Sequence, residues 1–406
     1  MFSISVFRRC IAPWLLVAMV LALPAPAVAV SESGLRSALA AQMRHAGAAS
    51  SVYVVRLDGD EPVYSLRADR PLIPASVNKL FTTSTALSLF GPGERLQTAA
   101  LAASALDEDG VLHGNLYLKG GGDPTLNATR LAELADELVD AGLTRIDGNV
   151  LGDESLFDRL RGSTNTGGRL DSEVTGQLGA LVTSRGYAPR GWQKRPAAVA
   201  ADALRTALVD RDVRVRAKHA GVGTAPEDAT ELAHVSSAPM STLIRLTNVP
   251  SDNYYAETLL KLLGARFGDG GTTRAGAEVV QDTLSDLDIK PTVVDGSGLS
   301  RSDRTTTRMV VQLLATMAGG ESADDFLGSL AVTGRSGTVQ YRMRTGAAAG
   351  SCRVKTGTLH DVSNLAGVCT TSGGEQVAFA ILMNAINPTT AHVLQDRMVT
   401  SIAGLR

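Results

Sequence analysis

The chain has 406 residues, of which 44% are hydrophobic, 20% are charged and only 4% are aromatic. These values are typical of a globular protein with an aliphatic core and exclude an intrinsically disordered chain. The formal net charge of -2 excludes a general electrostatic attraction to nucleic acid or to anionic lipid. We therefore expect no nucleic-acid partner.

Residues 1–29 have the pattern of a secretory signal peptide. Arg8 and Arg9 precede an apolar run from Ile11 to Leu23, and Ala27-Val28-Ala29 supplies the small residues of a cleavage site. A single membrane anchor is the alternative, but the run is short for crossing a bilayer. No later segment is long and apolar enough to do so. We expect export to a periplasm or cell-wall space, with no integral membrane segment after cleavage.

The mature chain of about 375 residues is long enough for two domains. Its first elements are two strands and a helix, predicted over Ser51–Leu57, Pro62–Leu66 and Ala75–Phe90. The middle has strands and helices of its own, predicted over Leu112–Leu118, Ala128–Ala141, Arg145–Leu151 and Ala197–Val209. Further helices are predicted over Pro239–Asn248, Asn253–Phe267, Thr273–Leu284 and Thr305–Ala318. The chain closes with strands between residues 353 and 384 and a helix over Ala391–Ile402.

Strands at both ends of the chain, with helices between them, indicate one sheet whose strands are far apart in sequence. The middle, residues 94–237, would then be an insertion. Between residues 157 and 195 the periodicity is weak, so we expect loops around short elements there. The fold class that follows is a mixed α/β (α+β) one.

Two cysteines, Cys352 and Cys369, remain after cleavage of the signal peptide. A metal site needs more ligands at tighter spacing, so we expect no metal and no other cofactor. The strand-like runs Arg353–Leu359 and Leu365–Thr370 would place the cysteines opposite each other in a hairpin. Two alternatives stay open: a disulfide, which is permitted outside the cytoplasm, or two buried thiols.

Three short motifs occur in order along the chain: Ser76-Val77-Asn78-Lys79, Ser251-Asp252-Asn253 and Lys355-Thr356-Gly357. Ser76 and Lys79 share one face of a predicted helix. A serine hydroxyl becomes a good nucleophile when a neighbouring base takes its proton, and a lysine of lowered pKa can be that base. Of 39 basic residues only seven are lysine, and two of these seven lie in the motifs.

The second and third motifs would complete such a site. Ser251 would relay a proton to the leaving group, and Asn253 would present its carboxamide to the substrate. Lys355, with Thr356, Gly357 and Thr358, would let a substrate backbone come close and hold its carboxylate. The backbone N–H groups of Thr358 and Ser76 would form an oxyanion hole. Each motif alone is also typical of a helix cap or a surface strand, but the three together favour covalent catalysis.

Longer strings around these motifs carry a family resemblance. They are Tyr117–Leu126 (YLKGGGDPTL), Gly152–Phe157 (GDESLF), Ser251–Glu257 (SDNYYAE), Asp295–Arg301 (DGSGLSR) and Leu365–Gly367 (LAG). The three-motif set is shared by penicillin-binding proteins and class A β-lactamases. With the longer strings, the sequence resembles the D-alanyl-D-alanine carboxypeptidase/endopeptidases of serine peptidase family S13, which are class C low-molecular-mass penicillin-binding proteins.

The resemblance implies a transpeptidase/β-lactamase-like domain with a five-stranded antiparallel sheet flanked by helices. Residues 30–93 and 238–406 would form this domain, and residues 94–237 one inserted α+β domain. Near residues 178–182 the chain runs almost directly to its next helix, where the fullest family members carry another insertion. We expect this loss to spare acylation and to change which polymeric substrates fit.

The resemblance also assigns roles. Ser76 would be acylated with Lys79 as its base, Ser251 and Asn253 would complete the second motif, and Lys355 would hold the substrate carboxylate. Asp153 matches a position in the inserted domain that contacts substrate. The substrate would be the stem peptide of peptidoglycan, ending in D-alanine, and β-lactam antibiotics would act as acylating inhibitors.

Three alternatives use the same scaffold: a β-lactamase, an esterase, or a non-catalytic wall-binding protein. A class A β-lactamase would carry a Glu-x-x-Leu-Asn string shortly after the nucleophile, and none follows Ser76. Intact motifs argue against a non-catalytic protein. The carboxypeptidase/endopeptidase is therefore our main hypothesis.

Overall fold

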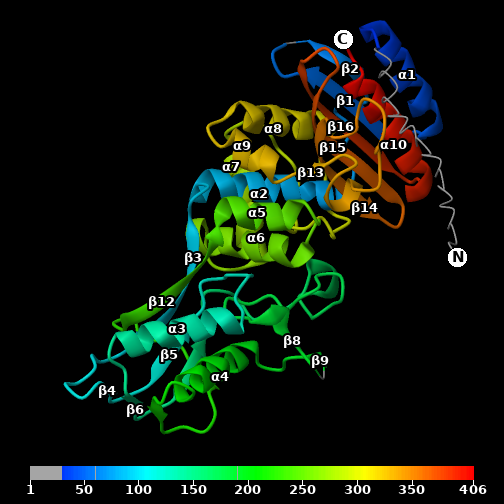
Figure 1. The fold of residues 1–406 in the computed structure, drawn as a ribbon. Coiled ribbons are helices and arrows are strands. Elements are labelled where there is room, and N and C mark those ends of the chain that lie inside the picture. Colours follow the sequence, from blue (N-terminus) through cyan, green and yellow to red (C-terminus); the bar gives the residue numbers. More distant parts are fainter. Residues whose placement is uncertain (1–29, 60, 190) are drawn as a thin grey trace, which may run out of the picture.

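The computed structural model describes residues 30–59, 61–189 and 191–406, so the predicted signal peptide over residues 1–29 lies outside the described residues. Figure 1 shows two lobes. The two ends of the described chain, at Val30 and Leu405, pair in one of them, the terminal lobe, and residues 95–239 form most of the other, the middle lobe. The strands β3 (Arg95–Ala102) and β12 (Thr230–Pro239) run from one lobe into the other.

The terminal lobe contains an antiparallel sheet with the strand order β13-β14-β15-β16-β1-β2. Its strands are β1 (Ser50–Arg56), β2 (Pro62–Leu66), β13 (Ala331–Val332), β14 (Cys352–Leu359), β15 (Val362–Thr370) and β16 (Gln376–Asn384). The expectation of five strands was one short, because the sixth is the two-residue edge strand β13. A strand of two residues is too short to give an alternating pattern in the sequence.

Helices cover both faces of this sheet. The helices α1 (Glu32–His45) and α10 (Pro388–Ala403) lie together on one face, and α8 (Thr307–Gly319) lies on the other (Figure 1). Strand β16 shows how the sequence separates the two faces. Its large side chains Val377, Phe379 and Ile381 join the core under α1 and α10, while Ala378 and Ala380 join the core on the α8 side.

A helical layer lies between this sheet and the middle lobe (Figure 1). It contains α2 (Lys79–Phe90), α5 (Met240–Asn248), α6 (Asn253–Phe267), α7 (Thr273–Ser285) and the short α9 (Ala323–Gly328). The predicted helix over Ala75–Phe90 starts with a 3₁₀ turn, η1 (Ala75–Asn78), before α2 begins. Because α2 is buried on almost all sides from Lys79 to Leu87, it forms the centre of this layer.

The middle lobe has two further sheets, with the orders β11-β7-β5-β3-β12 and β10-β6-β4. Besides β3 and β12, their strands are β4 (Val111–Leu112), β5 (Leu116–Lys119), β6 (Arg145–Ile146), β7 (Val150–Asp153), β10 (Arg214–Val215) and β11 (Gly221–Val222). The strands predicted over Leu112–Leu118 and Arg145–Leu151 are therefore each divided between the two sheets. The helices α3 (Ala128–Asp140) and α4 (Pro196–Val209) pack together here, close to their predicted ranges.

The segment from 157 to 195 consists of loops around short elements, as predicted. Its elements are η2 (Thr164–Thr166), η3 (Ser184–Gly186), β8 (Tyr187–Ala188) and β9 (Gly191–Trp192). This segment holds the middle lobe against α6. The Lys261 Nζ of α6 donates to Asp158 Oδ1 at 2.6 Å and to the Leu160 carbonyl at 2.9 Å.

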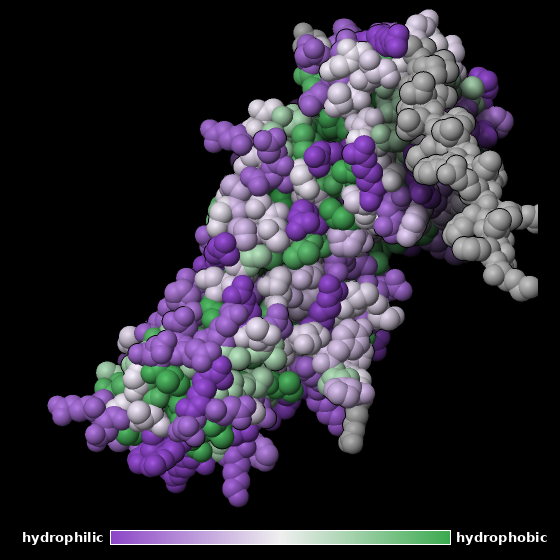
Figure 2. Space-filling view, viewed as in Figure 1, coloured by the Kyte–Doolittle hydropathy of each residue, from purple (hydrophilic) through white to green (hydrophobic). Residues whose placement is uncertain are grey.

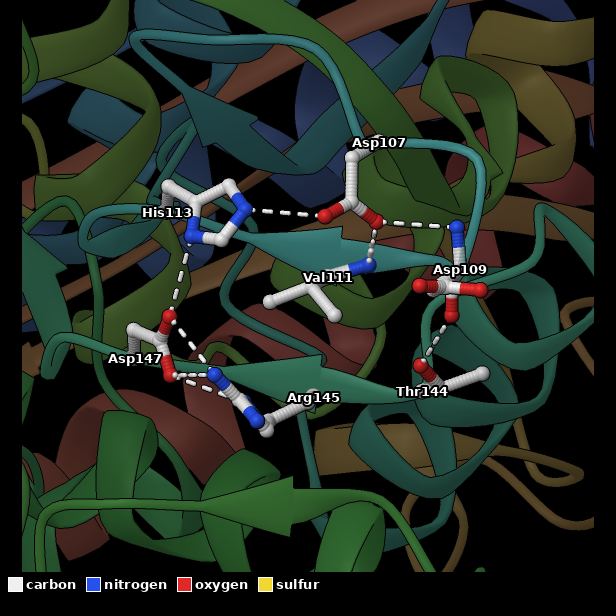
Figure 3. Close-up of polar contacts among 7 residues, drawn as sticks. All are labelled: Asp107, Asp109, Val111, His113, Thr144, Arg145 and Asp147. Carbon is white, nitrogen blue, oxygen red and sulfur yellow. Dashed lines mark hydrogen bonds and ion pairs between the residues drawn. The ribbon is translucent and has the colours of Figure 1, made fainter.

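An exposed polar cluster at the far end of the middle lobe joins three of its loops (Figure 3). The ring nitrogens of His113 lie 2.8 Å from Asp107 Oδ2 and 3.0 Å from Asp147 Oδ2, and we call these three residues the histidine clip. Arg145 donates to Asp147 from Nε at 2.8 Å. The two aspartates raise the pKa of His113 above its usual value. The clip therefore favours a charged imidazole.

One face of the molecule is mainly polar. Polar side chains cover most of the face shown in Figure 2, with apolar residues in smaller groups between them. In the described part of the chain, no helix has the length and apolar character needed to cross a membrane.

Cys352 and Cys369, paired across β14 and β15, form a disulfide, which resolves the alternative left open above.

Candidate active site

Ser76 lies in the 3₁₀ turn η1, and the loop before this turn is fixed by side chains of the sheet. Asn364 on β15 donates to the carbonyls of Ile73 and Pro74 at 2.9 and 2.7 Å. Asn384 Oδ1, at the end of β16, accepts from the Ile73 N–H at 2.8 Å. The nucleophile predicted from the sequence therefore stands on a turn that is anchored to two strands.

Lys79 is fully buried, and its ammonium group has three hydrogen-bond partners. Its Nζ donates to Ser76 Oγ at 2.9 Å, to Asn253 Oδ1 at 2.7 Å and to the Ser297 carbonyl at 2.7 Å. These contacts use all three donors of the group. Burial lowers the pKa of Lys79 to about 8, with the nearby carboxyl of Asp295 acting in the opposite direction. About a tenth of the lysine is thus neutral at pH 7, far more than for an ordinary lysine, and able to take a proton from Ser76.

The second motif is held between the two lobes. Asp252 caps α6 by accepting from the Tyr255 N–H at 3.1 Å, as its sequence position predicted. Arg185, from the middle lobe, donates to Asp252 Oδ2 at 2.5 Å. Asn253 Nδ2 donates to the Glu173 carbonyl, also in the middle lobe, at 2.7 Å. Since its Oδ1 accepts from Lys79, both ends of the Asn253 carboxamide are oriented.

The third motif connects to the second through its lysine. Lys355 is almost completely buried, and its Nζ donates to Ser251 Oγ at 2.7 Å and to the Thr356 carbonyl at 2.8 Å. Burial, together with the charge of Lys79, lowers the pKa of Lys355 well below its usual value. Thr356 Oγ1 lies 2.8 Å from Thr338 Oγ1. Lys355 thus links the Ser251 hydroxyl to the Thr356 carbonyl, and the Thr356 side chain continues the contacts to Thr338.

Gly357 lies where two segments of the backbone approach each other closely. A Cβ atom at this position would lie 2.6 Å from the Pro74 carbonyl oxygen, 2.9 Å from the Val77 nitrogen and 3.0 Å from the Ser76 nitrogen. The glycine therefore lets β14 approach the turn that carries the nucleophile. A larger residue would push the strand and the turn apart.

A cavity of about 240 Å³ opens over this network. It is lined by Ser76, Ser251, Thr338, Arg342, Thr356, Thr358 and His392. Four predicted residues, Ser76, Ser251, Thr356 and Thr358, thus share one cavity. Lys79 and Lys355 lie behind its wall, where their Nζ atoms contact the two serines. The sequence analysis missed Thr338, Arg342 and His392, which come from segments outside the three motifs.

Three buried carboxyl groups, also missed, lie near Lys79: Glu257, Asp295 and Asp303. Glu257 Oε1 accepts from the Ser297 N–H at 2.8 Å, and the carbonyl of the same Ser297 accepts from Lys79. Burial raises the pKa of all three carboxyls far above the usual range. They are therefore partly protonated near neutral pH, which limits the negative charge near the lysine. Glu257 and Asp295 stand in strings singled out above, which was the one signal for them.

Asp153 does not share the cavity over Ser76. It lines a separate cavity of about 510 Å³ in the middle lobe, and its two oxygens accept from the N–H groups of Ser155 and Ala225 at 2.9 Å each. Within the described ranges, no group of three or more His, Cys, Asp or Glu side chains has an arrangement that could hold a metal ion. The three motifs bring hydroxyls, lysines and a carboxamide together around Ser76.

Comparison with known proteins supports the same assignment. The profile of the Peptidase S13 family, described as D-Ala-D-Ala carboxypeptidase 3, matches residues 34–187 and 166–405. A D-alanyl-D-alanine carboxypeptidase of an Actinomadura species is 30% identical, covering 88% of this chain and 81% of its own length. A carboxypeptidase of Mycobacterium tuberculosis is 28% identical over 82% of this chain and 76% of its own.

The fold has solved counterparts. The crystal structure of penicillin-binding protein 4 from Haemophilus influenzae superposes with a TM-score of 0.76 at 20% identity, covering 89% of this chain and 97% of that one. At this identity the match concerns the fold, and it agrees with the predicted transpeptidase/β-lactamase-like architecture. The two matched segments of the family profile together span residues 34–405. The chain therefore belongs to the S13 peptidases, the family of D-Ala-D-Ala carboxypeptidases and penicillin-binding proteins.

Proposed function

We propose that Ser76 is the nucleophile of a serine-type D-Ala-D-Ala carboxypeptidase/endopeptidase that acts on the stem peptides of peptidoglycan. The observation that carries the proposal is the 2.9 Å contact between Ser76 Oγ and the Nζ of Lys79, a lysine whose pKa burial lowers to about 8. A buried lysine of this kind is a competent general base for a hydroxyl. Family membership supplies the reaction class, a hydrolysis of D-alanyl peptides.

Acylation follows from this geometry. Neutral Lys79 takes the hydroxyl proton while Ser76 Oγ attacks the carbonyl carbon of the penultimate D-alanine. The backbone N–H groups of Ser76 and Thr358 stabilise the negative charge that develops on the carbonyl oxygen. As the C–N bond breaks, the proton reaches the leaving nitrogen through the Ser251 hydroxyl, which Lys355 orients at 2.7 Å. The step exchanges an amide bond for an ester bond and releases D-alanine.

Deacylation returns the serine. A water molecule gives a proton to the base and attacks the ester carbon, and Ser76 Oγ leaves with that proton. The shortened peptide then ends in a carboxylate. A β-lactam would acylate Ser76 by the same first step, since its ring carries the reactive amide. A penicillin-binding protein 4 of the same fold has been solved in complex with a β-lactam, which supports this reading.

We also infer the place of action and the division of the chain. Residues 30–93 and 238–406 would form the catalytic domain, and residues 94–237 the inserted domain. The sequence of residues 1–29 and the Cys352–Cys369 disulfide both favour an exported protein, since disulfides persist in oxidising compartments. The periplasm or cell-wall space, where peptidoglycan lies, is the compartment that fits the proposed substrate.

One experiment separates this function from the alternatives. Purified protein and a Ser76→Ala variant are labelled with fluorescent penicillin, and loss of label is followed over time beside release of D-alanine from a pentapeptide stem. We expect slow loss of label from the wild type only, together with D-alanine release. Rapid turnover of penicillin without D-alanine release would identify a β-lactamase. With an ester substrate added to the assay, hydrolysis of the ester without release of D-alanine would identify an esterase. No labelling of the wild type would refute the proposal.

A further inference from the structure

The cavity over Ser76 has an unequal distribution of positive charge. Its two lysines stand behind the wall, and each Nζ is occupied: Lys79 by three acceptors, Lys355 by two. Neither lysine lines the cavity. A peptide that ends in D-alanine carries a carboxylate one residue beyond the bond to be cut. Such a group needs charged or multiple hydrogen-bond donors when it leaves water.

Arg342 is the residue of the cavity wall that offers such donors. Its side chain is 14% exposed, and it lies in the loop between η4 (Gly337–Val339) and β14. On the α10 side, its Nε donates to Asp396 Oδ1 at 2.9 Å and its Nη2 to Gln395 Oε1 at 3.0 Å. Its Nη1 has no partner within the described part of the chain. Helix α10 thus fixes one edge of the guanidinium and leaves the other edge free.

The rest of the wall suits an anion as well. Thr338, Thr356 and Thr358 line it beside Arg342. The Thr356 hydroxyl donates to Thr338 Oγ1 at 2.8 Å, which leaves the hydroxyls of Thr338 and Thr358 as donors. His392 also lines the cavity, and burial, helped by the charge of Arg342, lowers the pKa of its imidazole. The guanidinium is therefore the permanent positive charge of this wall, since an arginine stays protonated in proteins.

We propose that Arg342, held by Asp396 and Gln395, binds the terminal carboxylate of the substrate's last D-alanine and so selects peptides with a free C-terminus. The inference rests on the function proposed above. It assigns to Arg342 part of the carboxylate recognition that the sequence analysis gave to Lys355 alone. Lys355, with its lowered pKa and its bond to Ser251, is better placed to serve the proton relay.

The test compares two substrates that differ at one group. Acyl-D-Ala-D-Ala with a free carboxylate and its C-terminal amide are hydrolysed by the wild type, by Arg342→Gln and by Arg344→Gln. Arg344 is an exposed arginine two residues away with no place in the cavity wall, so it serves as a matched control. Rates are normalised to the fraction of molecules that take up labelled penicillin at saturation, which corrects for misfolded protein.

The expected result is a selective loss. In Arg342→Gln, kcat/KM for the acid should fall about 10- to 100-fold, the usual effect of removing one charge-assisted hydrogen bond, mainly through KM. The rate on the amide should stay within about threefold of the wild type, as should both rates of the control. Arg342→Lys, which keeps a charge but loses the fork geometry, should lie between the two.

Four outcomes would overturn the inference. The acid rate of Arg342→Gln could equal that of the wild type, or the acid and amide rates could fall together, as a purely structural role would require. If Arg342→Gln cannot be purified, Arg342→Lys gives the same comparison, and an unchanged ratio of acid to amide rates would count against the proposal. If the wild type released no D-alanine at all, both the inference and the proposed function would be refuted. The first two outcomes would refute the inference and leave that function intact.

Discussion

Replacing Gly357 by alanine tests whether the approach of β14 to the nucleophile turn is necessary. The new Cβ would stand 2.6 Å from the Pro74 carbonyl oxygen and within 3.0 Å of two further backbone atoms. All three belong to the backbone of the anchored turn, so no flexible side chain can move aside. The strand or the turn must therefore shift by about half an ångström or more. Overpacking of this kind costs about 1–3 kcal/mol of folding free energy.

The catalytic effect should exceed the effect on stability. A displacement of about 1 Å at a reacting centre can cost about 100-fold in rate, so we expect penicillin to acylate Gly357→Ala about 10- to 100-fold more slowly than the wild type. Stopped-flow acylation gives the rate, and chemical denaturation gives the free energy of unfolding.

A matched control isolates the contact from the change of residue. At Gly319, near the end of α8, an added Cβ meets nothing within 4 Å. We expect Gly319→Ala to be acylated at the wild-type rate and to be neutral or slightly stabilising. An acylation rate of Gly357→Ala equal to that of Gly319→Ala would refute the reasoning.

Three further predictions concern titration and the disulfide. The rate of acylation should rise about tenfold per pH unit up to about pH 8 and then level off, because only neutral Lys79 accepts the Ser76 proton; a rate independent of pH between 6 and 8 would contradict this. Converting Cys352 and Cys369 to serine should lower the free energy of unfolding by about 3 kcal/mol, as expected for a loop of 17 residues, and an unchanged denaturation midpoint would argue against it. In an NMR titration, His113 should show a pKa above 6.5. The protonated histidine clip then stabilises the fold below the pKa of His113 in the unfolded chain, and this contribution is lost as the pH rises through the pKa in the folded state. A pKa at or below 6.5 would show that the aspartates do not hold the proton.

Sequence patterns located most of the long helices, but they missed α1 and the two strands β3 and β12 that join the lobes. The helix over Asn253–Phe267 and the strand over Pro62–Leu66 have the predicted bounds, because their periodicity and end signals are local. Strand β3 was missed, since its alanines have low strand propensity and its pairing with β12 joins residues about 130 positions apart. The division of Leu112–Leu118 into two strands likewise depends on partners, not on its own residues.

The same distinction applies to the site. Ser76 and Lys79 were found because they lie three positions apart, and the other two motifs because each is a short string. Ser297, whose carbonyl holds Lys79, and Arg342 were missed because only the folded chain brings them to the nucleophile. A backbone carbonyl has no signature in a sequence, and one arginine among many gives no signal by itself.

The most direct test of the central claim is the position of the penicillin adduct. Protein incubated with penicillin is digested, and the modified peptide is identified by mass spectrometry. We predict that the whole penicillin mass is carried by the peptide containing Ser76, attached at that serine, and that the Ser76→Ala variant carries none. An adduct on any other residue, or an unmodified wild type, would contradict the account.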